Sequence, residues 1–221
     1  MGGESSSWRD LARLFLDRRL LVFVVCATLF FFNDAALLPI AGAQVTKHSG
    51  RLANLVIAAS IVLPQLIAAG ISPWIGRSAD RWGRRAVLLL GFAAVPLRAL
   101  LLSLSAHAGM LILVQGLDGL SASVFGVMMP LVIADITEGT GHFNALVGVV
   151  GLAISGGAAL STLVAGTVAD HFGTSDVFLV LASGGVVSLL LLLFAMPETR
   201  PARAPLPARQ TRRRELLHVY D

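Results

Sequence analysis

Charged residues are scarce in this sequence. Asp, Glu, Lys and Arg make up 14% of the 221 residues, whereas hydrophobic residues make up 56%. The mean hydropathy is +0.80, and this combination excludes an ordinary soluble domain, in which about 25% of residues are charged. The sequence is typical of a membrane protein. Cysteine is limited to Cys26, so an intrachain disulfide is also excluded.

Several motifs that carry chemistry are lacking too. The sequence has no glycine-rich nucleotide-binding loop, no Cys and His spacing for a metal, and no arrangement of nucleophile and base. None of its five histidines lies midway along an apolar run. We therefore expect no cofactor, no metal and no enzymatic activity. The same absences argue against an ATP-driven pump.

Six apolar runs are long enough to cross the ~30 Å hydrocarbon core of a bilayer, which takes about 20 helical residues. They do not alternate as the strands of an outer-membrane barrel do, so we predict helices. The predicted fold class is an all-α membrane protein with six transmembrane helices. The predicted spans are 20–45, 52–75, 86–105, 109–135, 142–168 and 176–196.

Lys and Arg gather at one end of these spans. Fourteen of the 17 lie before the first span, after the second or after the sixth, whereas Lys47 and Arg51 lie on the opposite side. The positive-inside rule then predicts that both termini are cytoplasmic. We expect a multi-pass protein of a bacterial inner membrane. Its net charge of +4 reflects this bias and predicts no nucleic-acid partner.

The chain divides into three segments. Residues 1–19 form a cytoplasmic tail, in which residues 8–19 are amphipathic and are expected to lie at the membrane interface. Residues 20–196 form the membrane domain. Residues 197–221, rich in Pro and Arg, are predicted to be a disordered, basic cytoplasmic tail. A cleaved signal peptide is the alternative for the start, but it would contain Asp34 and exceed the usual 15 to 30 residues.

The two halves of the membrane domain resemble each other. A shift of 90 residues aligns "GRSADRWG" at 76–83 with "GTVADHFG" at 166–173, and a shift of 91 aligns Pro39 with Pro130. Because three helices are an odd number, the second three-helix unit would be inverted relative to the first, as in many secondary transporters. Chance matching of small apolar residues is the alternative.

The stretch "GRSADRWGRR", at 76–85, holds five charges between two apolar spans. Its glycines allow close helix approach or a positive φ. Its aspartate is expected to cap the start of the third helix, and its arginines to keep the connection cytoplasmic and to pair with acidic groups. The residues of interest are Gly76, Asp80, Arg81, Gly83, Arg84 and Arg85.

Ionisable side chains inside a span are candidate functional groups, because each costs about 2.5 to 3.5 kcal/mol at a helix centre. Asp34 lies near the middle of the first span. Asn33 beside it and Gln65, midway along the second span, are expected to complete a polar cluster. An ordinary interhelical hydrogen bond is the alternative role for Asn33 and for Gln65.

Arg98 and Asp118 form a second candidate. They lie at similar depths in the third and fourth spans, which a short connection makes neighbours, so a buried ion pair is expected. Such a pair has a structural or a substrate-binding role with equal weight. Gln115, Asp118 and Ser121 follow one another at steps of three and form a polar stripe on one helical face. An intramembrane enzyme would require Asp34 and Asp118 to meet as a catalytic pair.

The stretch at 76–85 resembles the cytoplasmic signature of the major facilitator superfamily, G-x-x-x-D-R-x-G-R-R, at every defined position. "PETR", at 197–200, is similar to the motif that follows the last helix of many members, and six spans equal one half of the usual twelve. The resemblance implies that the signature residues latch a cytoplasmic gate. It also implies two six-helix halves that rock around a cavity lined by the first and fourth helices of each.

Three features favour the C-terminal half of such a protein. They are "PETR" after the last span, an arginine-rich lead into the first span, and the lack of the Arg that usually precedes the Gln-Gly pair at 115–116 in the first half. A single half lacks half of the cavity. The missing half would come from a second six-helix chain or from a homodimer.

The resulting expectation is a secondary transporter, or half of one, that moves a small molecule by alternating access. An ion gradient would drive it. Asp34 would bind a proton or a cationic substrate, and the residues that would shape its site are Asn33, Gln65, Gln115, Asp118 and Arg98. Efflux is expected because it is the commonest role in the family. The alternative is a non-transporting interaction or regulatory module, or a truncated transporter fragment.

Overall fold

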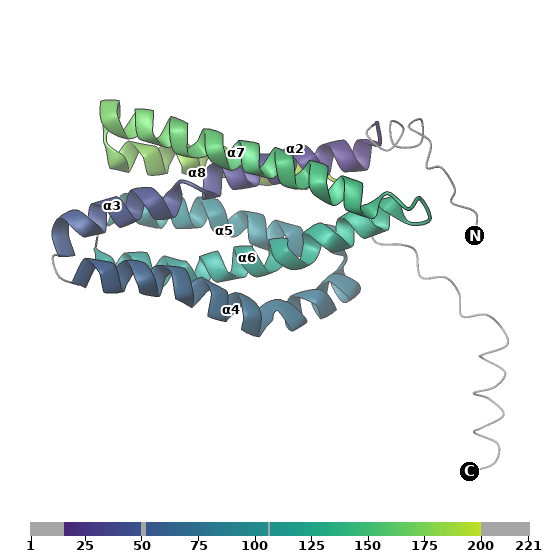
Figure 1. Cartoon of the computed structure of the whole chain (residues 1–221), viewed down its shortest axis with the longest axis horizontal. Helices are drawn as coiled ribbons and strands as arrows, with labels where there is room; N and C mark the ends of the chain where they lie inside the picture. The colour runs from purple at the N-terminus through teal and green to yellow at the C-terminus, as the bar shows by residue number, and fades with distance from the viewer. Residues whose placement is uncertain (1–15, 50–51, 106, 200–221) are drawn as a thin grey trace, which may run out of the picture.

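The computed structural model describes residues 16–49, 52–105 and 107–199. The regular secondary structure in these ranges is helical (Figure 1). The helices are α2 (Arg18–Asp34), α3 (Leu37–Ser49), α4 (Ala53–Trp82), α5 (Arg84–Leu104), α6 (Ala108–Thr137), α7 (Phe143–Phe172) and α8 (Thr174–Ala195). The predicted cytoplasmic tail 1–19 lies largely outside the described residues, as does most of the tail 197–221.

Six stretches of the described chain are long and apolar enough to cross a membrane, and α2 and α3 together form the first of them. The prediction of an all-α protein with six spans is confirmed. The predicted bounds are too short at several ends. The second span was expected to end at 75, but α4 continues to Trp82, and α7 continues to Phe172. The helices continue past the apolar runs because the backbone N–H and C=O groups of the polar residues at their ends still form hydrogen bonds within the helix.

The first span is not one continuous helix. Helix α2 ends at Asp34 and α3 begins at Leu37, with a turn at Ala35 and Ala36 between them. Pro39 explains the position of this break. It lies in the first turn of α3, where its missing N–H cannot bond to the carbonyl of Ala35. The break places Asp34 at the end of a helix in the middle of the span.

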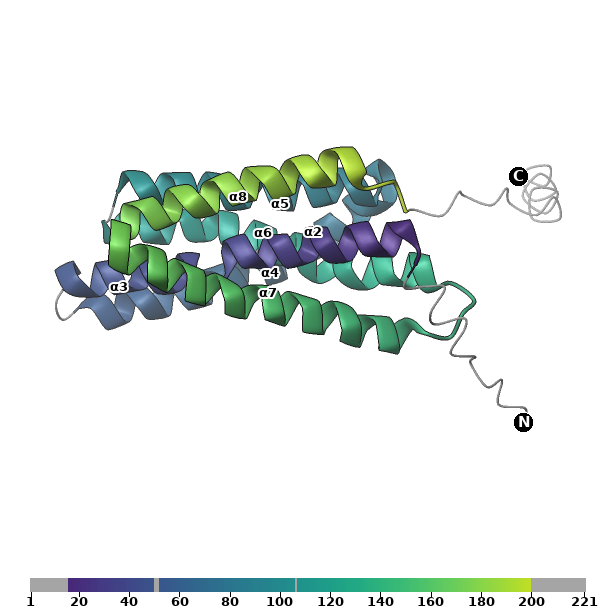
Figure 2. The same cartoon turned by 90° about the horizontal axis from the view of Figure 1, so that it is seen from above.

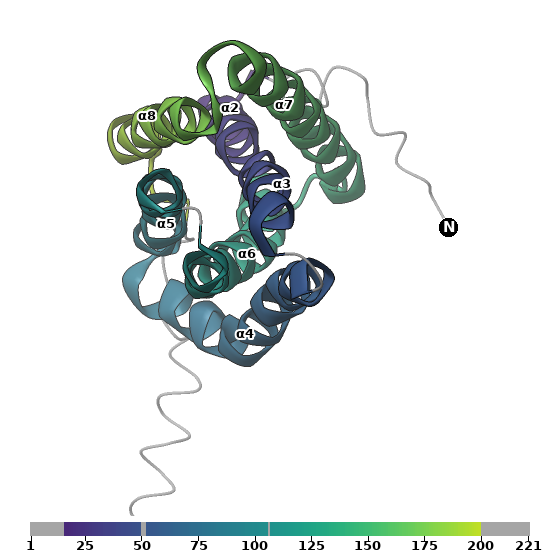
Figure 3. The ribbon, with the colours of Figure 1, turned by 90° about the vertical axis from the view of Figure 1, so that its left-hand side faces the viewer.

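The helices form a bundle in which sequence neighbours are not always spatial neighbours. Helix α2 packs against α7 and α8, α5 packs against α6 and α8, and α4 packs mainly against α6. Seen end-on, α5 and α8 lie together, and α4 and α7 lie apart with α3 and α6 between them (Figure 3). Only 11% of the apolar window of α4 and 17% of that of α7 are buried, against 56% for α5.

Small residues set the distance between packed helices. A side chain at Gly119 of α6 would overlap Ile67 of α4, and one at Gly157 of α7 would overlap the Thr28 carbonyl of α2. Close backbone approach of this kind is the usual device of membrane helices, which gain no hydrophobic energy from each other in lipid.

Both ends of the membrane domain lie on the same side of the bundle. Helix α2 begins and α8 ends at one end, and the purple and yellow ribbon ends lie together there in Figure 2. The α4–α5 and α6–α7 connections reach the same end, because an even number of antiparallel spans separates them from α2 or α8. The arginine-rich stretch at 76–85 is therefore at this end.

Candidate functional site

Arg98 of α5 joins two carboxylates from two other helices. Its Nη1 lies 2.5 Å from Oδ1 of Asp34 at the end of α2 and 2.6 Å from Oδ1 of Asp118 on α6. The expected pair of Arg98 and Asp118 is confirmed. The sequence predicted no direct contact between Asp34 and Arg98, and this ion pair joins the two candidate clusters.

The three charged groups differ in exposure. The side chain of Arg98 is 2% exposed, whereas those of Asp34 and Asp118 are 20% and 21% exposed. When all three are ionised, two negative charges oppose one positive charge. A single guanidinium nitrogen, Nη1 of Arg98, contacts both carboxylates. The two aspartates are the more exposed groups of the site. Arg98 Nε is buried and has no hydrogen-bond partner within the described chain.

An aromatic layer separates this site from the arginine-rich end. Phe30 of α2 stacks on Phe125 of α6 at 5.4 Å between ring centroids and lies 4.8 Å from Phe92 of α5. Each of the three rings lies about one to two turns from the charged residue of its own helix, on the side of the arginine-rich end. This layer fixes the relative positions of α2, α5 and α6 and so places Asp34, Arg98 and Asp118 together.

The predicted polar stripe on α6 faces α5. Ser121 Oγ donates to the Gly91 carbonyl at 3.1 Å, and Asp118 binds Arg98 one turn away. Gln115 continues the stripe and is 1% exposed. Neither its Nε2 nor its Oε1 has a hydrogen-bond partner among the described residues. An unpaired buried amide is costly and is a candidate for contact with a ligand.

Asn33 and Gln65 are not joined to the carboxylate of Asp34 in this structure. Asn33 Nδ2 donates to the Leu29 carbonyl of its own helix at 2.6 Å, and its Oδ1 packs against Gly184 of α8. Gln65 is exposed on α4. The expected cluster of these two amides around Asp34 is therefore replaced by Arg98 and Asp118, because α5 and α6 supply the groups that face the end of α2.

A second charge cluster lies at the arginine-rich end. Arg84, at the start of α5, donates from Nη1 to Asp80 of α4 at 2.8 Å and from Nε to Asp135 of α6 at 3.0 Å. Arg84 and Asp135 are largely buried, with side chains 8% and 10% exposed, while that of Asp80 is 69% exposed. The expected pairing of the motif arginines with acidic groups is confirmed for Arg84.

Glu198 of the "PETR" stretch closes this cluster from the other side. Its Oε1 accepts the backbone N–H of Arg84 at 2.8 Å, and its Oε2 accepts that of Arg85 at 3.3 Å. These amides begin α5 and have no partner inside the helix. The expectation that Asp80 caps this helix is wrong: Asp80 is part of α4, and Glu198, distant in sequence, accepts the amides instead.

The expected loop at 76–85 is almost entirely helical. Gly83 alone separates α4 from α5, with φ +98° and ψ 161°, a conformation that is essentially restricted to glycine. Gly76 is inside α4, where an added Cβ would lie 3.9 Å from Val127 of α6. Arg81 is exposed near the end of α4, and Arg85 Nη2 donates to the Leu193 carbonyl near the end of α8.

No group of three or more His, Cys, Asp and Glu side chains in the described ranges is arranged to hold a metal ion. Asp34 and Asp118 do meet, as a catalytic pair would require, but a shared guanidinium nitrogen lies against both. The arrangement is a network of ion pairs within a membrane domain.

A family model described as the Major Facilitator Superfamily matches residues 23–220. The chain belongs to the major facilitator superfamily. It is 39% identical, over 183 residues, to an uncharacterized MFS-type transporter of Mycobacterium tuberculosis, with 83% of this chain and 44% of the relative covered. It is 32% identical to the class B tetracycline resistance protein of Escherichia coli, with 74% of this chain and 38% of that relative covered.

The resemblance found in the signature residues is thereby confirmed at the level of the family. MFS proteins are transporters and not enzymes, which agrees with the expectation for this chain. A multidrug resistance protein, MdtG, of Citrobacter koseri is a further relative, at 29% identity over 71% of this chain and 36% of the relative. The chain spans less than half the length of these relatives, and it supplies a six-helix membrane segment of the MFS type.

Proposed function

We propose that this chain works as half of a secondary active transporter that moves a small molecule by alternating access, coupled to protons. The observation that supports this most directly is the sharing of Arg98 between Asp34 and Asp118. The site has an excess of one negative charge when ionised. When a proton or a cationic substrate binds one of the two carboxylates, Arg98 and the remaining carboxylate form a pair with no net charge.

The position of the site suits such an exchange. Asp34 lies where α2 and α3 meet, and broken helices are common at the binding sites of secondary transporters. Gln115 offers an unpaired donor and acceptor one turn from Asp118. We propose Asp34 and Asp118 as the cation-binding groups, Arg98 as their common partner, and Gln115 as a group that shapes the site.

We propose that the signature residues latch the cytoplasmic gate. They are Gly76, Asp80, Arg81, Gly83, Arg84 and Arg85. Arg84 links α4, α5 and α6 through Asp80 and Asp135, so a change in the relative position of these helices must break an ion pair. Both termini are proposed to be cytoplasmic, since the arginine-rich ends of the spans lie together. The membrane is proposed to be a bacterial inner membrane.

We propose that a second six-helix half, or a second copy of the chain, completes the transporter. The low burial of α4 and α7 supports this, because the described chain leaves most of the apolar window of each helix uncovered. "PETR" after α8 supports assignment as the C-terminal half. The matching geometry of Gly83 and Gly173, with φ of +98° and +100° at single-residue connections, supports an inverted repeat. Efflux is supported by the names of two relatives, a tetracycline resistance protein and a multidrug resistance protein.

The first test is the native mass of the tagged chain, extracted gently from its own membrane. A stable homodimer or a complex with another six-helix chain is expected. A lone monomer of 23.2 kDa would favour the alternative, a regulatory module or a fragment without a complete cavity.

The second test measures transport into inverted membrane vesicles that contain the assembly. The probe is the cationic dye ethidium, and a proton gradient is imposed across the vesicle membrane. Asp34→Asn is expected to lower proton-driven uptake at least tenfold, as is Asp118→Asn. Asp176→Asn, an exposed carboxylate at the start of α8, is the matched control and is expected to transport normally. Unchanged transport with unchanged pH dependence in Asp34→Asn would exclude the proton role.

A further inference from the structure

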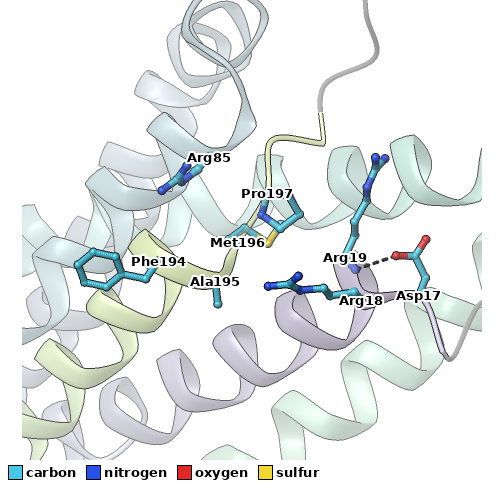
Figure 4. Close-up of a pocket in the computed structure, with 8 residues that line it drawn as sticks. All are labelled: Asp17, Arg18, Arg19, Arg85, Phe194, Ala195, Met196 and Pro197. Carbon is cyan, nitrogen blue, oxygen red and sulfur yellow. Dashed lines mark hydrogen bonds between the residues drawn. The ribbon is translucent and has the colours of Figure 1, made fainter.

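A basic pocket lies on the bundle at the arginine-rich end, beside the second charge cluster: its lining residue Arg85 follows Arg84, and its backbone N–H is bound by Glu198. It has a volume of about 450 Å³ and is formed where α2 begins, α5 begins and α8 ends (Figure 4). Its lining residues are Asp17, Arg18, Arg19, Arg85, Phe194, Ala195, Met196 and Pro197. Three arginines and one aspartate leave two net positive charges on a volume that suits a small ligand.

The guanidinium groups from α2 are available for a ligand. Asp17 Oδ1 accepts the backbone N–H of Arg19 at 2.7 Å, so the carboxylate already serves the helix terminus. Within the described chain, no hydrogen bond or ion pair is formed by the guanidinium of Arg18 or of Arg19. Figure 4 shows Arg18 extending across the pocket toward Ala195 and Met196.

Arg85 borders the pocket from α5 and is held in place. Its Nη2 donates to the Leu193 carbonyl, while its Nε is buried and has no partner in the described ranges. A buried guanidinium N–H without an acceptor is a costly arrangement that an anionic ligand would relieve. The requirement for positive charge at the cytoplasmic end explains arginines anywhere on that end. It does not explain why arginines of α2 and α5 border one pocket.

The place of the pocket selects the kind of anion. Every lining residue lies within three positions of the end of a candidate membrane span, which is the level of lipid headgroups. The other part of the lining is apolar, and Phe194 is 80% exposed beside it. A phosphate at the arginines with acyl chains along α8 would use both parts. Basic pockets between helices on the cytoplasmic side suit anionic headgroups.

We propose that this pocket binds the phosphate of an anionic phospholipid from the cytoplasmic leaflet, with Arg18 as its main ligand and with Arg19 and Arg85 adding positive charge at the rim. The lining of this pocket does not include Asp34 or Asp118, the carboxylates of the proposed transport site. The site tethers the start of the first span to the end of the sixth through a lipid, at a place where α2 and α8 already pack together.

The test is a binding measurement by thermophoresis on the full chain in a neutral detergent. The probes are dihexanoyl phosphatidylglycerol and dihexanoyl phosphatidylcholine, and glycerol 1-phosphate and inorganic phosphate are competitors. Phosphatidylglycerol is expected to bind at least tenfold more tightly than phosphatidylcholine. Each arginine near a membrane surface contributes about fivefold to the binding of an anionic lipid, so Arg18→Gln is expected to weaken phosphatidylglycerol by about that factor.

Arg77→Gln is the matched control, because Arg77 is exposed near the same end of the bundle, outside the pocket, and its Nε donates to the Pro73 carbonyl. It is expected to change the affinity less than twofold. Arg85→Gln is expected to weaken phosphatidylglycerol binding by a similar factor, and the exposed variant Arg19→Gln replaces it if Arg85→Gln does not fold. Equal binding of the two lipids, or equal weakening by Arg77→Gln and Arg18→Gln, would overturn the site. Competition by inorganic phosphate at the concentration of the lipid would overturn its assignment to a lipid.

Discussion

The Glu198 carboxylate occupies the space that a side chain at Gly83 would fill, at the junction of α4 and α5, although 114 residues separate Glu198 from Arg84, whose amide it accepts. A Cβ at position 83 would overlap Glu198 Oε2. Gly83 is thus needed twice, once for its positive φ and once for the space that Glu198 occupies. The hydrogen bonds of Glu198 join the end of the sixth span to the connection between the second and third.

Gly83→Ala and Gly173→Ala separate these two requirements. Both glycines have φ near +100°, so both substitutions cost about 1 to 3 kcal/mol of backbone strain. Only Gly83 has an atom within 4 Å of the added Cβ. We expect Gly83→Ala to lower the thermal unfolding temperature more than Gly173→Ala. In a Glu198→Ala background the excess should disappear, and an excess that persists would contradict the overlap.

Asp135→Asn and Asp80→Asn test which partner of Arg84 matters for stability. Asp135 is largely buried, and loss of its charge leaves Arg84 without a buried counter-ion, a loss of about 1.5 to 3 kcal/mol. Asp80 is mostly exposed, and such pairs contribute at most about 1 kcal/mol. In detergent, the thermal unfolding temperature of Asp135→Asn should be lower than that of Asp80→Asn. The reverse order would show that the ion pair with Asp80 is the stronger one.

Arg98→Met is expected to destabilise the chain by about 3 to 5 kcal/mol, because it leaves two carboxylates facing each other without a cation. The triple variant Arg98→Met, Asp34→Asn, Asp118→Asn removes all three charges and should recover most of this loss. Urea unfolding of both variants measures the difference. A triple variant as unstable as Arg98→Met would mean that the arginine acts through its packing.

Gly119→Ala tests the close approach of α4 and α6. Its Cβ would lie 2.7 Å from Ile67 and 2.9 Å from the Pro64 carbonyl, so overpacking should cost about 1 to 3 kcal/mol. Gly116→Ala, on the same helix, adds a methyl where no atom lies within 4 Å and should leave stability unchanged or raise it by up to about 1 kcal/mol. Thermal unfolding of the pair gives the comparison, and equal values would argue against the contact.

Some features follow from local sequence. The six spans were predicted because apolar runs of this length have one stable form in a bilayer, and their ends were misplaced because a helix continues past the apolar run. The pair of Arg98 and Asp118 was predictable because a short connection forces the third and fourth spans together. The break after Asp34 had a signal in Pro39 that the apolar pattern concealed.

The sequence by itself determined the number of membrane helices, the end that carries the arginines and the family, because hydropathy, charge bias and the signature residues are local properties. Only the tertiary structure decided that Asp34 joins Arg98, that Glu198 and not Asp80 accepts the amides of α5, and that Arg18 and Arg85 border one pocket. Each of these depends on which helices pack side by side. In this bundle that is set by small residues and aromatic rings acting between helices far apart in the chain.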